Sequence, residues 1–213
     1  MSITRGDVLQ NGEFYHVFNR GVDKAIIFRD NADRDRFVSS LARFHHNRVK
    51  IHAFCLMDNH YHLLLEQLND GGISSLMKSL SLGYTMYFNK KYRRTDSLFG
   101  SRYQFTHVTT EAHFLHISRY IHLNPVEMIA AVFYREGTFD VRALTEFLRG
   151  YRWSSYSDYV GVSRYAAFIV TREILSNFES PQVYEQFTLD WLFSRLQSPT
   201  LKLDFEEEVG QVG

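Results

Sequence analysis

Hydrophobic and polar positions follow two different periods along the first 133 residues. Four segments show the two-residue alternation or the β-branched and aromatic composition of strands; they span residues 14–21, 49–57, 60–67 and 97–108. Three others place apolar residues at helical spacing; they span residues 31–49, 73–92 and 110–133, and the last is interrupted or ended near Pro125. The expected order is strand, helix, strand, strand, helix, strand, helix.

The first six elements match the split βαβ, or ferredoxin-like, sandwich, in which helices cover an antiparallel sheet. We therefore predict an α+β fold over residues 1–133, with Asn31 as the N-cap of the first helix. Residues 134–200 are polar, rich in aromatic residues and mostly helical in pattern, which predicts a C-terminal helical appendage. Residues 201–213 have the composition of an acidic, solvated tail.

The composition is that of a globular protein and excludes several other classes. Hydrophobic residues make up 45% of the 213-residue chain, which is enough for one domain with a sizeable core. No apolar run approaches the roughly 20 residues of a membrane helix, and the first residues lack the apolar core of a signal peptide. The single cysteine, Cys55, excludes an internal disulfide framework and is expected to be buried. We expect a cytoplasmic protein with no membrane partner.

The formal net charge is zero, but the two halves of the chain differ in sign. Residues 1–104 contain 15 Lys/Arg and 10 Asp/Glu, whereas residues 105–213 contain 9 Lys/Arg and 14 Asp/Glu. This division between +5 and −5 is typical of a nucleic-acid-binding face on the N-terminal half. Chance spacing of solvated charges explains it equally well.

The stretch "MDNHYHLLLEQ" places two histidines one residue apart at the start of a predicted strand. Because side chains alternate across a strand, His60, His62 and Glu66 share one face. Two imidazoles on one face can bind a single metal ion. The alternative is that one histidine is hydrogen-bonded in the core and the other lies at the surface. Glu66 is interpreted as a polar strand end, because a strand rises roughly 13 Å over four residues.

The stretch "HISRYIHLNPV" could supply further ligands, because His116, Tyr120 and Asn124 recur every four residues on one helical face. Asn124 can offer a carbonyl oxygen to a metal ion, and Tyr120 would then project beside that ion. Pro125 disfavours helical geometry at Asn124 and is expected to kink or fray the helix. Ordinary alternatives are a half-buried aromatic for Tyr120 and a helix C-cap for Asn124.

Several stretches together resemble one family in the same order along the chain. "MDNHYHLLLE" resembles the HUH motif, and "SRYIHLNPV" resembles the nucleophile helix, of the single-tyrosine HUH transposases. "YHVFNRG", "LFGSRYQ" and the C-terminal "YRWSSYSDYVG" are similar to segments of the REP-associated tyrosine transposases, which have an IS200-type domain. The resemblance runs from about Tyr15 to Phe187.

The resemblance implies a metal-dependent transposase that cleaves and rejoins single-stranded DNA. Tyr120 would attack a backbone phosphate to form a 5′-phosphotyrosine and a free 3′-hydroxyl. His60, His62 and Asn124 would hold one Mg²⁺ or Mn²⁺ ion. No nucleotide cofactor is expected, because energy is conserved in the phosphotyrosine bond and the chain has no P-loop. His116 is a candidate helper that takes the phenolic proton, on helical geometry alone.

The implied partner is single-stranded or hairpin DNA, which would associate the protein with the nucleoid. The candidate DNA contacts are basic or aromatic residues able to neutralise phosphates or stack on unpaired bases; they are Arg20, Lys90, Lys91, Arg93, Arg94, Arg102 and Tyr103. A solvated basic loop beside core aromatics is the alternative reading of the same stretch. By similarity to longer relatives with a C-terminal extension, a monomer with Tyr120 acting in cis is favoured over a dimer.

The chain departs from its relatives at three positions. Glu127 stands where relatives commonly have arginine and small residues, Gln104 where lysine is common, and Asp58 where proline is common. Glu127 puts a basic DNA contact beside the nucleophile helix in doubt. One rival interpretation is a non-catalytic DNA-binding regulator on the same fold. A second is a metal hydrolase with a barrel fold, which usually needs about 250 residues.

Overall fold

The computed structural model describes residues 9–129 and 140–196. The N-terminal part contains four strands and three long helices; they are β1 (Phe14–Arg20), α1 (Asn31–Phe44), β2 (Val49–Leu56), β3 (His60–Gln67), α2 (Gly72–Tyr92), β4 (Gln104–Val108) and α3 (Glu111–Leu123). A 3₁₀ turn, η1 (Val22–Lys24), follows β1. The C-terminal part adds helices; they are α5 (Val141–Gly150), α6 (Tyr156–Tyr159), α7 (Arg172–Leu175) and α8 (Pro181–Leu196).

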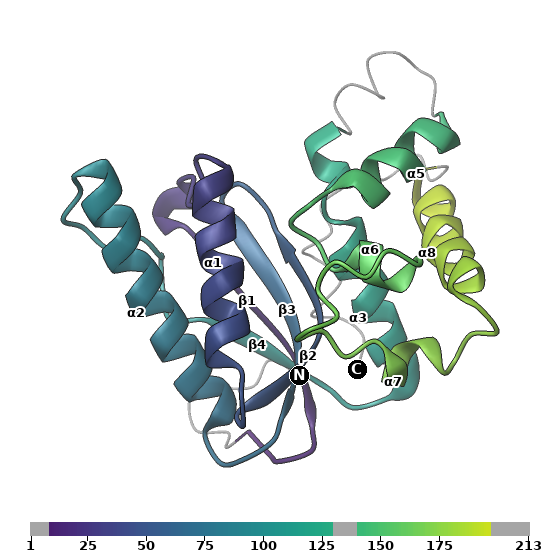
Figure 1. Ribbon diagram of the computed structural model, residues 1–213, viewed down its shortest axis with the longest axis horizontal. Coiled ribbons are helices and arrows are strands. Elements are labelled where there is room, and N and C mark those ends of the chain that lie inside the picture. Colours follow the sequence, from purple (N-terminus) through teal and green to yellow (C-terminus); the bar gives the residue numbers. More distant parts are fainter. Residues whose placement is uncertain (1–8, 130–139, 197–213) are drawn as a thin grey trace.

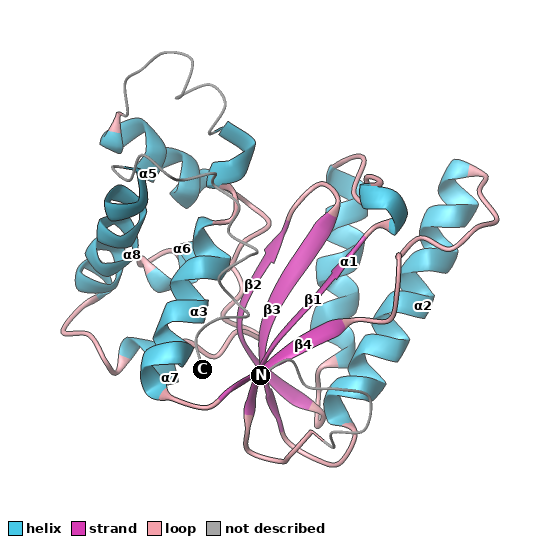
Figure 2. Cartoon of the chain, turned by 180° about the vertical axis from the view of Figure 1, so that it is seen from behind, coloured by secondary structure: helices cyan, strands magenta, loops and turns pink. Residues whose placement is uncertain are grey.

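The four strands form one antiparallel sheet in the order β2-β3-β1-β4. Helices α1 and α2 lie on one face of this sheet, and α3 lies on the other with the C-terminal helices beyond it (Figures 1 and 2). This is the expected ferredoxin-like arrangement with a C-terminal helical part. The proposed acidic tail at residues 201–213 lies outside the described residues.

Two boundaries differ from the expectations for local physical reasons. Helix α1 is capped by Asp30, not Asn31, because the Asp30 carboxylate accepts a hydrogen bond from the backbone N–H of Asp33 at 3.0 Å. The same helix ends at Phe44, before Asn47 adopts a left-handed conformation with φ of 55°. The last strand begins seven residues later than expected, because the segment before it crosses the end of β1. There the backbone N–H of Gly100 donates to Arg20 O at 3.1 Å.

Alternation along β3 places its side chains in two different layers. Tyr61 faces α1, where its ring centroid lies 4.9 Å from that of Phe37. His62 faces α3, where its ring centroid lies 5.3 Å from that of Tyr120. Leu63, Leu64 and the rest of β3 are buried, so both faces of the sheet are covered at this strand. Cys55 on the adjacent β2 is buried as expected.

The C-terminal part covers the outer edge of β2. Short backbone bridges join Ile51 to Ile169 and Cys55 to Ser154. The N–H of Leu56 donates to Trp153 O at 2.9 Å. An uncovered edge strand presents unpaired N–H and C=O groups that can pair with another chain. These segments therefore complete the sheet at one side.

A buried histidine joins α3 to the same C-terminal part. Nδ1 of His122 lies 2.7 Å from the Tyr184 hydroxyl on α8, and Nε2 lies 2.8 Å from the Ser155 hydroxyl. Ser155 in turn accepts a hydrogen bond from the N–H of Phe54 on β2 at 2.9 Å. One continuous chain of hydrogen bonds therefore links β2, α3 and α8.

Across the described ranges, no helix is long and apolar enough to cross a membrane.

Candidate functional site

The two histidines of β3 lie buried together beneath α3. Their ring centroids are 5.0 Å apart, and only 5% of His60 and 2% of His62 is exposed. Nε2 of each ring is buried and has no hydrogen-bond partner among the described residues. The expectation that both rings share one face is therefore correct, and neither ring lies at the open surface.

A third histidine, His16, orients the second one and was not identified in the sequence. Nε2 of His16 lies 2.9 Å from Nδ1 of His62. This contact occupies Nδ1 of His62 and leaves Nε2 without a hydrogen bond of standard geometry. A neighbouring group commonly fixes the orientation of a ligating imidazole in this way. Alternation along β1 places His16 on the same face as Arg20, but only the pairing of β1 with β3 shows that it meets His62.

Helix α3 brings Tyr120 and Asn124 to the same place. Tyr120 is 2% exposed, and its ring packs edge-on against both His62 and His16, with centroids 5.3 Å and 5.6 Å apart. Asn124 is the C-cap of α3, and its Nδ2 donates to Tyr120 O at 2.9 Å. The amide is fixed by that bond, while its Oδ1 is buried without a hydrogen-bond partner in the described ranges. Asn124 therefore caps the helix and also lies in the site.

Pro125 ends α3 without distorting Asn124. The helix ends at Leu123 and helical turns resume at residue 126. Asn124 keeps helical dihedrals, with φ of −48° and ψ of −40°, so the expected departure from helical geometry is wrong at this residue. The hydrogen bond from its side chain to Tyr120 O holds the turn in place.

Burial holds the imidazoles of this site in their neutral form. It lowers the pKa of His60 to about 4, with a further lowering by the Arg20 charge and a small opposing effect of the nearby Asn124. The pKa of His62 is lowered by burial and by the neighbouring histidines, and that of His16 is lowered by burial to about 3. Neutral imidazole is the form that binds metal ions.

The same environment keeps the Tyr120 phenol protonated. Burial raises its pKa above the ordinary value, and the Glu127 carboxylate raises it further. Asn124 and Arg20 oppose that rise. Attack by this oxygen therefore requires that its proton be removed and that charge be compensated during the reaction.

The chemistry of the donor atoms fits a divalent ion. Nε2 of His60, Nε2 of His62 and Oδ1 of Asn124 are three buried polar atoms without a hydrogen bond of standard geometry to any described residue, and the Asn124 side chain interacts with both His60 and Tyr120. Buried polar atoms are rarely left in that state, and imidazole nitrogens with an amide oxygen form a recognised ligand set for divalent metals. No group of three His, Cys, Asp or Glu side chains in the described ranges could hold a metal. A metal ion bound by His60 and His62 would therefore need a ligand of another kind, such as Asn124.

The predicted DNA contacts fall into two groups. Arg20 is opposite His60 in the β1–β3 register, and its charge lowers the pKa of His60, so it lies beside the imidazoles. Arg102 and Tyr103 lie just before β4 and line a pocket there. Lys90, Lys91, Arg93 and Arg94 lie at the C-terminal end of α2, on the other side of the sheet.

Two of the α2 cations are already engaged. The Lys91 ammonium lies 2.8 Å from Asp30 and 2.7 Å from Asp33. The Arg94 guanidinium lies 5.8 Å from the centroid of the Phe88 ring. Lys90 and Arg93 are exposed. The basic stretch is therefore not uniformly available for phosphates.

His116 packs toward the C-terminal part. Its Nδ1 lies 3.2 Å from Nη2 of Arg119, and its ring centroid lies 5.4 Å from that of Trp191 on α8. Its role as proton acceptor stays a prediction. Asp58 has a structural partner, because its carboxylate pairs with the buried Arg34. Glu66 pairs with Lys50 at 3.0 Å and lies near His52, which supports its interpretation as a polar strand end.

Comparisons with known proteins agree with this architecture. The solved structure of a REP-associated tyrosine transposase bound to a REP hairpin is similar to this chain with a TM-score of 0.55 and 14% sequence identity. The similarity covers 80% of this chain and 92% of the other. None of the curated proteins matches the sequence.

A family model described as "Transposase IS200 like" matches residues 13–124, which is 112 of the 213 residues. The match begins beside β1 and ends at Asn124, so it includes β1, β3 and α3, the three elements that form the histidine and tyrosine site. The chain therefore belongs to the IS200-like transposase family.

Proposed function

We propose that this transposase is a metal-dependent single-stranded DNA endonuclease and strand transferase with Tyr120 as its nucleophile. The observation that carries the proposal is the contact between Tyr120 and His62, beside three buried donor atoms without a hydrogen bond of standard geometry to any described residue. Family membership implies DNA cleavage in general terms. The residues brought together here support the tyrosine version of that chemistry.

In the proposed reaction the Tyr120 oxygen attacks a backbone phosphorus of the DNA. The bond from that phosphorus to the 3′ oxygen breaks, leaving a 5′-phosphotyrosine and a free 3′-hydroxyl. The phenolic proton passes to solvent or a nearby base, and the 3′ oxygen takes up a proton. Attack by a second 3′-hydroxyl reverses these steps and joins new strands without a nucleotide cofactor.

Each residue of the site has a separate task in this proposal. His60, His62 and Asn124 would hold one Mg²⁺ or Mn²⁺ ion, which when bound supplies positive charge to polarise the phosphate and stabilise the leaving oxygen. His16 positions the His62 ring. Arg20 would compensate charge on the phosphate, because its own charge acts on both His60 and Tyr120.

The proposed partner is single-stranded DNA next to a hairpin, because the similar solved structure is described as bound to a REP hairpin. We also propose that one chain is sufficient. Tyr120 and His62 meet within the same chain, and the β2 edge is covered by the chain's own C-terminal segments. Light scattering that shows a dimer, or activity regained on mixing Tyr120→Phe with His60→Ala protein, would contradict this.

A DNA-binding regulator without catalysis is the second candidate, and the burial of Tyr120 favours it. Only 2% of Tyr120 is exposed and its pKa is raised, so the phenol is neither accessible nor ionised in this conformation. A regulator would bind the hairpin and would need no nucleophile.

The deciding experiment uses single-stranded oligonucleotides that tile the DNA flanking the gene, with Mn²⁺ and denaturing gels. We expect a covalent protein–DNA adduct that is lost in Tyr120→Phe and in His60→Ala. Tyr87→Phe and His46→Ala are matched controls that remove the same groups on the α1 and α2 side of the sheet, and both should keep the adduct. Specific binding with no adduct for any oligonucleotide would support the regulator.

A further inference from the structure

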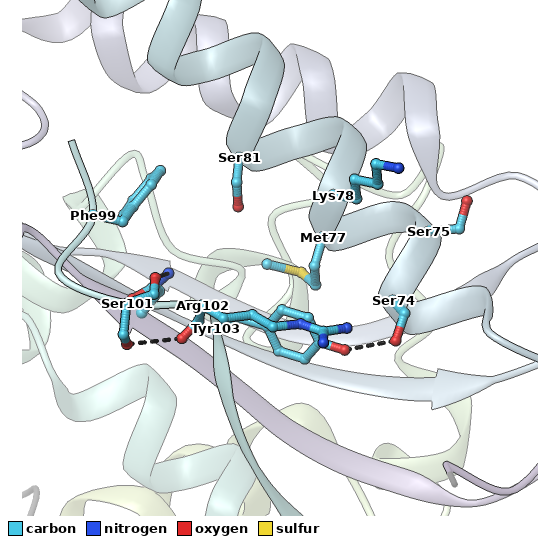
Figure 3. Close-up of a pocket in the computed structure, with 10 residues that line it drawn as sticks. Ser74, Ser75, Met77, Lys78, Ser81, Phe99, Ser101, Arg102 and Tyr103 are labelled. Atoms are coloured by element: carbon cyan, nitrogen blue, oxygen red, sulfur yellow. Dashed lines mark hydrogen bonds between the residues drawn. The ribbon is translucent and has the colours of Figure 1, made fainter. Parts of the chain in front are cut away.

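A pocket of about 520 Å³ lies between α2 and the segment that leads into β4, on the opposite face of the sheet from His60 and His62 (Figure 3). Its volume is within the range of sites that bind small molecules, about 300–1,000 Å³. The residues that give it its chemistry are Ser74, Lys78, Ser81, Phe99, Arg102 and Tyr103.

The lining combines flat apolar surfaces, hydroxyl groups and positive charge. Phe99 and Tyr103 bring aromatic rings from the segment before β4, and Ser81 brings a hydroxyl group from α2. Lys78 and Arg102 are exposed cations in the same lining. Aromatic rings, hydrogen-bonding groups and cations are what an unpaired nucleotide needs for its base and its phosphates.

The wall of the pocket is held in a fixed position. The Tyr103 hydroxyl lies 2.8 Å from the Ser74 hydroxyl on α2, which ties the two walls together (Figure 3). The Arg102 guanidinium lies 5.3 Å from the centroid of the Tyr103 ring. A preformed pocket orders few additional side chains when a ligand binds, which favours affinity.

A buried tyrosine, Tyr61, lies behind two residues of the pocket lining, Ser81 and Asn19. Tyr61 of β3 is fully buried, and burial raises its pKa, while polar contacts with Ser81 and Asn19 oppose the rise. Both of those neighbours line the pocket. The Tyr61 hydroxyl has no hydrogen bond of standard geometry in the described part of the chain. The hydroxyl and amide groups of Ser81 and Asn19 are therefore polar groups of the lining that a ligand could also engage.

Strand β1 connects this pocket to the candidate catalytic site. Asn19 faces the pocket, where its Nδ2 donates to Ser101 O at 3.1 Å. The next residue, Arg20, faces the other way and is paired with His60 in the sheet register. The end of β1 therefore presents one residue to each site, on opposite faces of the sheet. A DNA strand that crosses this end of the sheet can reach both.

We propose that the pocket binds one unpaired nucleotide of the DNA strand that is cleaved at Tyr120, with the base against Tyr103 and Phe99 and its phosphates beside Lys78 and Arg102. This inference rests on the proposed function, because it takes the same single-stranded DNA as the ligand. The pocket would fix which phosphate reaches Tyr120, since a nucleotide held at one point sets the register of its neighbours.

The test measures binding by fluorescence anisotropy in the Tyr120→Phe background, where no cleavage occurs. The probes are hairpin oligonucleotides from the flanking DNA, with and without their single-stranded flank, and a series with one abasic site at each flank position. Ser81→Phe places a ring inside the pocket. Leu82→Phe places the same ring on the next, exposed residue, outside the lining, and is the matched control.

We expect Ser81→Phe to weaken binding of the flanked hairpin about tenfold, as the loss of one stacked base would. Binding of the hairpin without a flank should not change, and Leu82→Phe should resemble the parent. One abasic position should weaken the parent by a similar factor and have no further effect in Ser81→Phe.

Equal binding by Ser81→Phe and the parent, or a flank without any sensitive position, would overturn the pocket proposal. These outcomes are separate from a failure of the proposed function, which would appear as normal binding without an adduct in the protein that retains Tyr120. Failure of the parent to bind any hairpin or single strand would overturn both.

Discussion

The β2 edge of the sheet is covered by C-terminal segments, whereas the β4 edge carries a short strand whose residues are mostly only partly buried. All but one of the eight β2 residues are buried, and C-terminal segments pair with its backbone at Ile51 and Cys55. Only Val108 among the five β4 residues is buried. The pocket lies beside the second edge, and the histidine and tyrosine site lies under α3 between the two.

The two edges of the sheet therefore differ in what they contribute, one to stability and the other to access for a ligand. The covered edge contributes stability and blocks pairing with another chain. The open edge leaves room for an elongated ligand beside Arg102 and Tyr103. Substitutions at the covered side should therefore change the free energy of unfolding, and substitutions at the open side should change DNA binding.

The largest effect on stability is expected for His122→Ala. It removes a fully buried ring and leaves the Tyr184 and Ser155 hydroxyls without their shared partner, which should lower the free energy of unfolding by about 3 kcal/mol. The measurement is urea unfolding followed by circular dichroism. His107→Ala on β4 is the matched control, because that ring is partly exposed and pairs with Glu13 at 2.9 Å. We expect a loss of less than about 1 kcal/mol there, and equal losses would contradict the contrast between the edges.

A smaller and pH-dependent effect is expected for Glu66→Gln at the covered side. The hydrogen bond with His52 and the contact with Lys50 hold the pKa of Glu66 below its ordinary value of 4.5. A depressed carboxyl pKa stabilises the fold above the unfolded value, and that contribution is lost as pH falls through the folded value. Glu66→Gln should therefore lower stability by about 1–2 kcal/mol at pH 7, with a difference that shrinks below pH 4.5.

Urea unfolding of the Glu66→Gln protein at pH 7, 5 and 4 measures this change. Glu13→Gln at the open edge is the control, because the Glu13 side chain is 42% exposed. Its effect should stay within about 0.5 kcal/mol at every pH. A Glu66→Gln difference that grows on acidification would show that the ion pair has the opposite linkage.

The smallest expected effect concerns two neighbouring lysines at the end of α2. Lys90 is exposed and pairs with no carboxylate among the described residues, whereas Lys91 pairs with Asp30 and Asp33. If Lys90 meets a phosphate, Lys90→Gln should reduce the slope of log affinity against log salt by about one. Lys91→Gln should leave that slope unchanged, because its charge is already neutralised. The reverse pattern in anisotropy titrations at several salt concentrations would exclude Lys90 as a phosphate contact.

Local patterns predicted most of the elements and part of the site. The two-residue period of β3 correctly placed His60 and His62 on one face, and the four-residue spacing in α3 correctly placed Tyr120 and Asn124 together. Both arguments need only the geometry of a single element. His16 was missed because its contact with His62 depends on which strands are paired. The register of β1 with β3 cannot be predicted from the sequence of either strand alone.

The segment before β4 shows the same limit. Its alternating apolar residues suggested a strand, but Leu98 and Phe99 are buried where the backbone crosses the end of β1. The apolar pattern of this segment therefore reflects burial and not the hydrogen-bonded pairing of a strand. The pocket exists because of that crossing. Composition could suggest Arg102 and Tyr103 as candidate DNA contacts, but it could not predict that both line one cavity.

The bridge between β2 and the C-terminal part also has a consequence in time. The last residue of β2 is Leu56, and its partner Trp153 follows about 100 residues later in the chain. At a synthesis rate of about 5–20 residues per second, Trp153 is made roughly 5–20 seconds after Leu56, and the β2 edge is uncovered during that time. Until those segments emerge, the β2 edge of the nascent chain can pair with a neighbouring nascent chain. The C-terminal segments that cover β2 are therefore synthesised well after the strand that they protect.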